Sequence, residues 1–349
     1  MPDASRTAPN EDQKPIKRRK LVRVGYKSSR GTMFCGKIED FLKSTVAHEL
    51  TGKVQLIFTS PPFPLNTKKA YGNRQGEEFS KWLADLAPEF KKLLTPNGSI
   101  VMEMGNAWEP GKPVMSVLAL QSLLEFLRKG TLELAQQFIC YNPARLPSPA
   151  QWVNVDRIRL KDAYTHLWWM APTDRPYADN RNVLQPYSKS MLDLLRTKKY
   201  NAGKRPSEHN IGEKSFLRDN SGAIPANVLT ISNTGNGDVY QRYCRENEIK
   251  PHPARMPLAL PEFFIKFLTK ENDLVMDPFA GSNTTGAVAQ RLNRRWVAVE
   301  ANDDYVKSSR SRFMRLKAKK NDSHRTAEGP ATRRNASQSR DGADRVPLH

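Results

Sequence analysis

The residues that most constrain the fold are a largely apolar run at 54–58 and two prolines that follow it, Pro61 and Pro62. A short apolar run of this kind is typical of a strand buried on both faces of a parallel sheet. Each proline lacks a backbone N–H and has a fixed φ, so the pair ends the strand. Open α/β sheets bind their ligands beyond the carboxyl ends of such strands. The segment therefore predicts a parallel sheet with a rigid turn at its ligand-binding edge.

The turn carries three groups suited to a flat ring that bears an amine. Ser60 supplies a hydroxyl, Pro61 supplies a carbonyl outside any strand ladder, and Phe63 supplies an aromatic face. An exocyclic amine can donate hydrogen bonds to both oxygens while its ring stacks on the phenyl group. The alternative is a plain strand terminator followed by a buried phenylalanine, and these four residues alone do not decide between the two.

A glycine-containing loop far downstream favours the first interpretation. A strand at 273–276 runs into Asp277, small residues follow, and Thr284 or Thr285 is placed to cap the next helix. Roughly twenty residues after Asp277, the next strand ends at Glu300. This is the layout of a nucleoside site, with an acid for the ribose hydroxyls. The loop has neither the G-x-G-x-x-G spacing of dinucleotide sites nor the lysine of ATP-binding P-loops.

The alternation of predicted strands and helices indicates a doubly wound α/β fold with a mostly parallel sheet. The predicted strands are 31–36, 54–60, 99–104, 132–141, 163–170, 273–276 and 296–299, and the predicted helices are 38–50, 77–94, 114–128, 258–268, 287–292 and 303–317. Residues 64–76 form a long polar connection after Phe63. Its length favours a lid that faces the substrate, and a plain solvated loop is the alternative.

The charge of the chain indicates a polyanionic partner. The 349 residues carry a formal net charge of +20, and the basic residues are not confined to the ends. Nucleic acid is the first candidate. The three cysteines contain no C-x-x-C pair and predict neither a disulfide framework nor a zinc site. Because no signal peptide and no membrane-spanning apolar run are found, we expect a cytoplasmic protein without a membrane partner.

Composition divides the chain into five segments. Residues 1–20 and 319–349 are polar, and we predict a disordered basic arm and a disordered tail. Residues 21–170 are the predicted catalytic part of one domain, and residues 251–318 are its cofactor-binding part. Between them, residues 171–250 are rich in Arg, Lys, Asn and Gly, and Arg and Asn pair well with guanine and adenine edges. We predict an inserted target-recognition module there, with an ordinary basic surface insertion as the alternative.

Two motifs together resemble a known enzyme family. Residues 277–286, Asp-Pro-Phe-Ala-Gly-Ser-Asn-Thr-Thr-Gly, look like the S-adenosylmethionine loop of amino-methylating DNA methyltransferases. Residues 60–63, Ser-Pro-Pro-Phe, look like their catalytic motif in the serine form typical of cytosine-N4 enzymes. The catalytic motif comes first, which is similar to the circularly permuted β group, and residues 252–255, His-Pro-Ala-Arg, match a segment of that group. The resemblance covers about 31–318. Lys37 departs from it, because many relatives carry an acid there.

The resemblance implies a methyltransferase fold that uses S-adenosylmethionine, acts on double-stranded DNA and needs no metal. The expected catalytic residues are Ser60, Pro61, Pro62 and Phe63, and the expected cofactor-binding residues are Asp277, Phe279, Gly281, Ser282, Asn283, Thr284 and Glu300. The family role is protection of host DNA in a restriction–modification system. A cognate restriction endonuclease would act on the same site, and we expect no direct contact with it.

The serine form of the catalytic motif favours the N4 amine of a cytosine that has been flipped out of the duplex. Two alternatives stay open. One is methylation of adenine N6 by the same machinery, and the other is a non-catalytic DNA-binding protein that keeps the fold as a scaffold. The chain contains no Pro-Cys pair, so we do not expect the thiolate nucleophile of C5-cytosine methylation.

Overall fold

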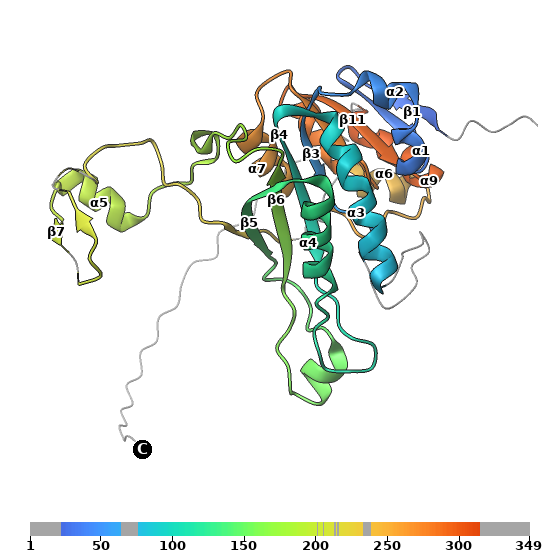
Figure 1. Ribbon diagram of the computed structural model, residues 1–349. Coiled ribbons are helices and arrows are strands. Elements are labelled where there is room, and N and C mark those ends of the chain that lie inside the picture. The colour runs from blue at the N-terminus through green and yellow to red at the C-terminus, as the bar shows by residue number, and fades with distance from the viewer. Residues whose placement is uncertain are drawn as a thin grey trace, which may run out of the picture. The chain divides into compact units, whose positions relative to one another are not determined.

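The computed structural model describes residues 22–63, 76–200, 202–204, 206–212, 214, 216–232 and 239–314. These residues form a nine-stranded sheet with the order β1-β2-β11-β10-β3-β4-β6-β5-β9 (Figure 1). The strands are β1 (Arg23–Lys27), β2 (Gly31–Cys35), β3 (Val54–Thr59), β4 (Leu94–Gly105), β5 (Glu133–Tyr141), β6 (Tyr164–Ala171), β9 (Val228–Thr230), β10 (Leu274–Asp277) and β11 (Arg295–Glu300). The predicted arm at 1–20, the tail at 319–349 and most of the predicted lid at 64–76 lie outside the described residues.

The sheet is mostly parallel, as the sequence predicts. Strands β2, β11, β10, β3 and β4 run in the same direction, whereas β1 and β6 run antiparallel to their neighbours β2 and β4. Strand β5 is antiparallel to β6 and parallel to β9. The two central strands β3 and β10 are adjacent, although one comes early in the chain and the other late. The carboxyl ends of the parallel strands therefore form one edge, where such sheets bind ligands.

Helices cover both faces of the sheet. Side chains of α1 (Ile38–Leu42), α2 (Thr45–Glu49), α3 (Gly76–Leu93) and α4 (Leu118–Gly130) join the hydrophobic cluster on one face. Side chains of α7 (Ala259–Leu268), α8 (Thr284–Arg291) and α9 (Asp303–Ser309) join the cluster on the other. Figure 1 shows α3 and α4 lying along each other in front of the strands.

The central strand β3 is largely apolar because both of its faces are buried, and its polar residues Gln55 and Thr59 are buried as well. Ile57 belongs to the cluster beneath α3 and α4, whereas Leu56 and Phe58 belong to the cluster beneath α7 and α8. Successive side chains of a strand point to opposite faces, so a sheet covered on both sides favours apolar residues on both faces of the strand. This is why residues 54–58 are apolar except for Gln55.

Two helices have other boundaries in the structure than the sequence predicts. The predicted helix 38–50 is two short helices, and Ser44 begins the second by accepting a hydrogen bond from the backbone N–H of Ala47. The predicted helix 114–128 begins only at Leu118, because residues 114 and 115 pair back onto 108 and 109 instead. Strands β1 and β9 were not predicted. Both are short edge strands, and neither carries a long apolar run.

The predicted module at 171–250 is only partly separate from the sheet. Its strand β9 pairs with β5, and its helix α6 (Val239–Glu246) buries Tyr240 and Cys244. By contrast, α5 (Lys189–Thr197) has no buried residue, and β7 (Gly203–Lys204) pairs only with β8 (Asn210–Ile211). Residues 171–250 thus contain both elements that pack on the sheet and elements that lie outside its layers.

Gly31 allows β2 to approach β11 closely. A Cβ atom at this position would overlap the backbone oxygen and the indole ring of Trp296. The same pairing places Cys35 opposite Glu300, and the N–H of Gly36 donates to the Glu300 carbonyl at 2.9 Å. The glycine therefore helps to set the position of the predicted cofactor acid.

We expect Gly31→Ala to lower the free energy of unfolding by about 1–3 kcal/mol, because the added methyl group has no space. Urea denaturation measures this change, and Thr32→Ala on the same strand is the matched control. An unfolding free energy equal to that of the Thr32→Ala protein would contradict the close approach.

Candidate active site

The two predicted motifs meet at the carboxyl ends of β3 and β10. The Thr59 hydroxyl at the end of β3 donates a hydrogen bond to Asp277 Oδ1 at 2.9 Å, across 218 residues of sequence. Ser60 follows Thr59 directly, and the glycine-containing loop follows Asp277. The catalytic turn and the cofactor loop therefore lie side by side at one edge of the sheet.

A cavity of about 790 Å³ opens between them. This volume is in the range of small-molecule and cofactor sites. Ten of the eleven predicted site residues line it, namely Ser60, Pro61, Pro62, Phe63, Asp277, Phe279, Gly281, Ser282, Thr284 and Glu300. Asn283 does not line it.

At one end of the cavity, Ser60 donates a hydrogen bond to the carboxylate of Glu103 on β4. The Thr165 hydroxyl on β6 donates to the same carboxylate at 3.0 Å. Burial raises the pKa of Glu103, while the two hydroxyl groups and the charge of Arg145 oppose the rise. Because the Ser60 proton is directed to Glu103, the lone pairs of the Ser60 oxygen are left to accept hydrogen bonds from a ligand.

Phe63 lies against the tip of β4. A Cβ atom at Gly105 would lie 2.8 Å from two atoms of the Phe63 ring, so the ring packs directly on the backbone there. Pro61 is buried and Pro62 is half-buried, which fixes the turn between Ser60 and the ring. The hydroxyl and the aromatic face are thus held at one end of the cavity.

Asp277 organises the cofactor loop. Its side chain is buried and accepts hydrogen bonds from Thr59, from the backbone N–H of Phe279 at 3.1 Å and from the Thr285 hydroxyl at 2.7 Å. Burial raises the pKa of Asp277 to about 6, against the effect of these three donors. With three protein donors, the carboxylate holds the loop to β3 and α8.

Asn283, and neither Thr284 nor Thr285, caps helix α8. It adopts a left-handed conformation with a φ of 52°, and its side chain accepts from the N–H of Gly286 at 3.1 Å. Its amide also donates to the Tyr26 hydroxyl at 2.9 Å. Asn283 therefore supports the loop from behind the cavity wall. The sequence-based prediction of a helix cap at Thr284 or Thr285 was wrong.

Glu300 holds the loop from the neighbouring strand. Its two carboxylate oxygens accept from the backbone N–H groups of Gly281 at 2.9 Å and of Asn302 at 2.8 Å. Burial raises the pKa of Glu300, and these backbone donors oppose the rise. Gly281 has a φ of 50°, and a Cβ there would lie 3.0 Å from the His252 ring. The glycine therefore brings the backbone close to the cavity wall.

The far wall contains Lys37, the position that departs from the family pattern. Lys37 lines the cavity together with Glu39, whose carboxylate accepts a hydrogen bond from Trp82 Nε1 at 2.8 Å. The Trp82 ring lies 5.6 Å from that of Phe279, centroid to centroid. A carboxylate and two aromatic rings are therefore available on this side even though residue 37 is a lysine.

Comparisons with known proteins agree with this geometry. A family described as DNA methylase matches residues 54–311. The chain is 42% identical over 291 residues to "Type II methyltransferase M.PvuII" of Proteus hauseri, covering 83% of this chain and 85% of that protein. This chain belongs to the DNA methylase family. The predicted DNA methyltransferase class and the family resemblance are confirmed.

A solved structure and a second relative support the assignment of this chain to the DNA methylase family. A solved structure titled "PvuII DNA methyltransferase (cytosine-N4-specific)" matches with a TM-score of 0.68 and 36% identity, covering 84% of this chain and 89% of that one. "Type II methyltransferase M.BglII" of Bacillus subtilis is 26% identical over 264 residues, covering 72% of this chain and 61% of that protein. The predicted fold class is confirmed.

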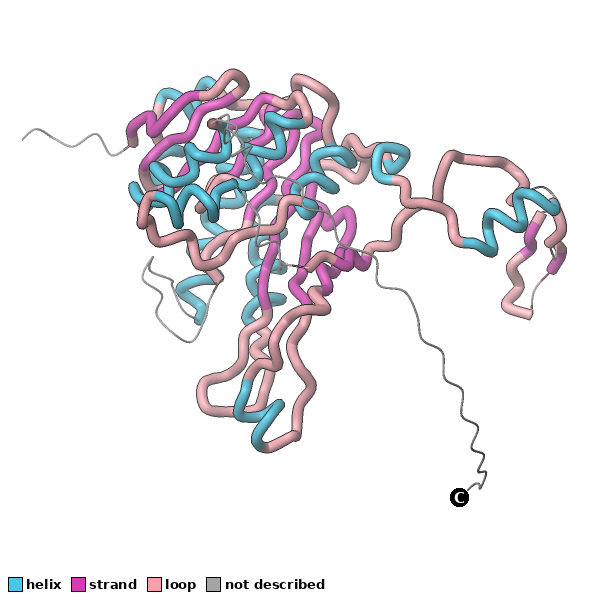
Figure 2. The backbone as a smooth tube through the Cα atoms, turned by 180° about the vertical axis from the view of Figure 1, so that it is seen from behind, coloured by secondary structure: helices cyan, strands magenta, loops and turns pink. Residues whose placement is uncertain are grey.

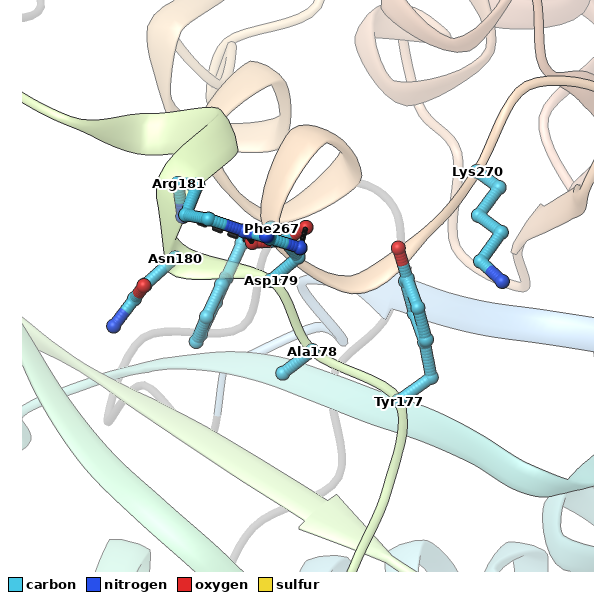
Figure 3. A pocket seen from close by; sticks show the side chains of 7 residues that line it. All are labelled: Tyr177, Ala178, Asp179, Asn180, Arg181, Phe267 and Lys270. Carbon is cyan, nitrogen blue, oxygen red and sulfur yellow. Dashed lines mark hydrogen bonds and ion pairs between the residues drawn. The ribbon is translucent and has the colours of Figure 1, made fainter. Parts of the chain in front are cut away.

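A second hollow of about 550 Å³ lies at the opposite edge of the sheet (Figure 3). There the N–H of Tyr177 donates to the carbonyl of Asn97, which precedes the parallel part of β4. Asp179 is paired with Arg181, and Lys270 lies over the Tyr177 ring. The charged groups in the hollow thus bind one another or a neighbouring ring. The hollow lies away from the strand ends that carry the two motifs.

Glu103, Trp82 and His252 were not predicted as site residues. Glu103 lies near the end of the predicted strand 99–104, and His252 begins the His-Pro-Ala-Arg segment that matches the family, so both had a signal in the sequence. Trp82 had none, since its position depends on how α3 packs. Among the described residues, no cluster of acidic, His or Cys side chains could hold a metal ion. No helix in the same residues is long and apolar enough to span a membrane.

The raised pKa of Asp277 predicts how this residue affects stability as the pH changes. In the unfolded chain its pKa is about 3.9. Between about pH 4 and 6 the folded protein holds a proton that the unfolded chain has lost. The stabilising contribution of Asp277 is therefore fully present below about pH 4 and is lost as the pH rises through 6.

We therefore expect the free energy of unfolding of the wild type, minus that of Asp277→Asn, to fall as the pH rises from 4 to 7. Urea denaturation at several pH values measures the difference. Asp303→Asn is a control that should stay nearly level over this range, because hydrogen bonding to Lys307 lowers the pKa of Asp303 and its contribution changes only below about pH 4. A difference for Asp277→Asn that rises with pH would show that hydrogen bonding outweighs burial at this carboxylate.

Proposed function

We propose that this DNA methylase transfers the methyl group of S-adenosylmethionine to the N4 amine of a cytosine flipped out of duplex DNA. The observation that carries the proposal is the hydrogen bond from Ser60 to Glu103 at the end of the cavity. It prepares the Ser60 oxygen as an acceptor for an amine. The serine form of the motif and the cytosine-N4 enzyme among the similar structures support cytosine as the target.

The amine of cytosine is a poor nucleophile because its lone pair is delocalised into the ring. Hydrogen bonds from its two N–H groups to the Ser60 oxygen and the Pro61 carbonyl favour a pyramidal nitrogen, whose lone pair then points at the methyl donor. Bound S-adenosylmethionine supplies an electrophilic methyl group on a sulfonium. The protein's task is therefore to position the amine and to stabilise the developing charge.

Glu103 gives the released proton a destination. As the nitrogen gains the methyl group, one of its protons passes to the Ser60 oxygen while the Ser60 proton passes to the Glu103 carboxylate. Burial raises the pKa of Glu103, which makes the carboxylate a better proton acceptor than an exposed one. No covalent enzyme intermediate is needed.

The remaining cavity residues divide between the base and the cofactor. Phe63 stacks on the flipped base and offsets part of the few kcal/mol that unstacking costs. The close backbone approach at Gly281, the carboxylates of Glu300 and Glu39, and the ring of Phe279 would hold the nucleoside part of S-adenosylmethionine. Asp277 acts through the loop that it holds.

Target recognition belongs to the exposed part of residues 171–250. Its helix α5 has no buried residue, and Lys189, Arg196 and Lys198 on or next to it are exposed. Basic residues of this kind contact phosphates, and Arg also reads guanine. Since two relatives are named type II methyltransferases, we propose that the enzyme protects host DNA in the cytoplasm beside an endonuclease that acts on the same site.

Ser60→Ala should bind S-adenosylmethionine and DNA with near wild-type affinity and lose about 10²–10⁴-fold in methylation rate, because both the acceptor and the proton path are removed. Single-turnover assays with a radiolabelled methyl donor measure the rate. Ser122→Ala, at a buried serine on α4 whose hydroxyl has no partner in the described structure, is the matched control. A Ser60→Ala rate within threefold of that control would rule out the mechanism.

Mass spectrometry of nucleosides from methylated DNA identifies the target base. We expect N4-methyldeoxycytidine, since the motif carries serine at position 60. N6-methyldeoxyadenosine would support the alternative target with the same machinery. Incorporation of no methyl group at all would support a non-catalytic DNA-binding role.

A further inference from the structure

Two loops extend from the sheet at the same edge as Ser60. Residues 106–117 follow β4, and residues 142–163 connect β5 to β6 (Figure 2). The Trp108 and Trp152 rings lie 5.3 Å apart, centroid to centroid, and Arg159 Nε donates to the carbonyl of Pro113 at 3.0 Å. We call the pair of loops the paired-loop projection. These contacts make it one ordered unit.

The paired-loop projection exposes many large apolar side chains. Leu160 is 89% exposed and Leu146 is 80% exposed, the highest values among the large apolar residues that the structure describes as exposed. Further exposed residues of the projection are Val114, Met115, Val117, Val155 and Ile158. Clustered apolar exposure of this kind marks an interaction surface.

Leu146 and Leu160 lie on two neighbouring segments of the loop 142–163. Lys161 Nζ donates to the carbonyls of Pro143 at 3.2 Å and of Arg145 at 3.4 Å. Leu146 follows Arg145 directly in the sequence, and Leu160 directly precedes Lys161. The two exposed leucines therefore lie on neighbouring segments of the projection.

These segments lie next to the catalytic end of the cavity. Arg145, which precedes Leu146, lines the cavity itself. Thr165, which binds Glu103, is five residues after Leu160, and five residues span at most about 18 Å. A duplex whose flipped base occupies the cavity must therefore pass close to the leucines.

The charges around the leucines are suited to DNA. Arg145, Arg157, Arg159 and Lys161 flank them in sequence. The nearby carboxylate of Asp162 is buried and accepts a hydrogen bond from Asn106, so it offers little charge to the surface. Basic residues contact phosphates, while apolar side chains between them can enter a base step. A two-fold contact between copies of this chain would bring the same four cations together, which disfavours self-association there.

We propose that Leu146 and Leu160 form an apolar wedge that enters the DNA stack where the target base has left it. The proposal rests on the proposed function, because the space exists only when a base is flipped. The wedge lowers the cost of flipping by replacing part of the lost stacking. It adds a role in base opening to a surface that the catalytic mechanism does not use.

The test compares two duplexes. Plasmid DNA methylated by the wild type and sequenced at single-base resolution first gives the target sequence. One duplex carries this sequence fully paired, and the other has an abasic site opposite the target base, which makes opening easier. Single-turnover methylation is measured for the wild type, for the Leu146→Ala/Leu160→Ala double variant and for Leu124→Ala. Leu124 is a matched control, because it is 66% exposed on helix α4.

We expect the double variant to lose roughly tenfold in rate on the paired duplex and at most about threefold on the abasic one. The Leu124→Ala protein should equal the wild type on both. A double variant as fast as the wild type on the paired duplex, or equally slowed on both, overturns the wedge. So does a wild-type dimer that the double substitution dissociates, in sedimentation velocity, without a change in methylation. Failure of the proposed function is distinct, because the wild type itself would then methylate neither duplex.

Discussion

The Asp277 carboxylate is the interaction on which the site depends. It binds Thr59 from β3 and Thr285 from α8, and it also accepts the Phe279 N–H. One buried group therefore joins the strand that precedes the catalytic turn to the loop that precedes the cofactor helix. A buried carboxylate is costly unless donors surround it, so these contacts form together and fix the loop in one shape.

Close backbone approaches set the rest of the geometry. Gly31 lets β2 lie against Trp296, Gly105 lets the Phe63 ring rest on β4, and Gly281 brings the cofactor loop against His252. In each case a methyl group would occupy space that the neighbouring side chain fills. The three glycines, which have no side chain, therefore shape the cavity together with the groups that line it. The carboxylates of Glu103 and Glu300 complete it from β4 and β11.

Sequence reasoning predicted the parts of the site whose signals are local. Ser60 follows a largely apolar run, Phe63 follows the two prolines after it, and Gly281 lies in a loop between a strand and a helix. It missed Trp82, which reaches the cavity from a helix with no local sign of function, and it did not assign His252 to the site although His252 begins the segment that matches the family. It also placed the helix cap at Thr284 or Thr285, whereas Asn283 makes it. Several polar residues in a row can cap, and only the turn geometry selects one.

By itself the sequence determined the alternation of strands and helices, the order of the two motifs and the basic character of the chain, because these follow from periodicity, turn residues and charge. Only the tertiary structure decided that Thr59 and Asp277 touch, that Ser60 donates a hydrogen bond to Glu103, and that Leu146 and Leu160 lie on neighbouring segments. Such contacts join residues far apart in the chain. They depend on strand order and packing, which local patterns do not specify.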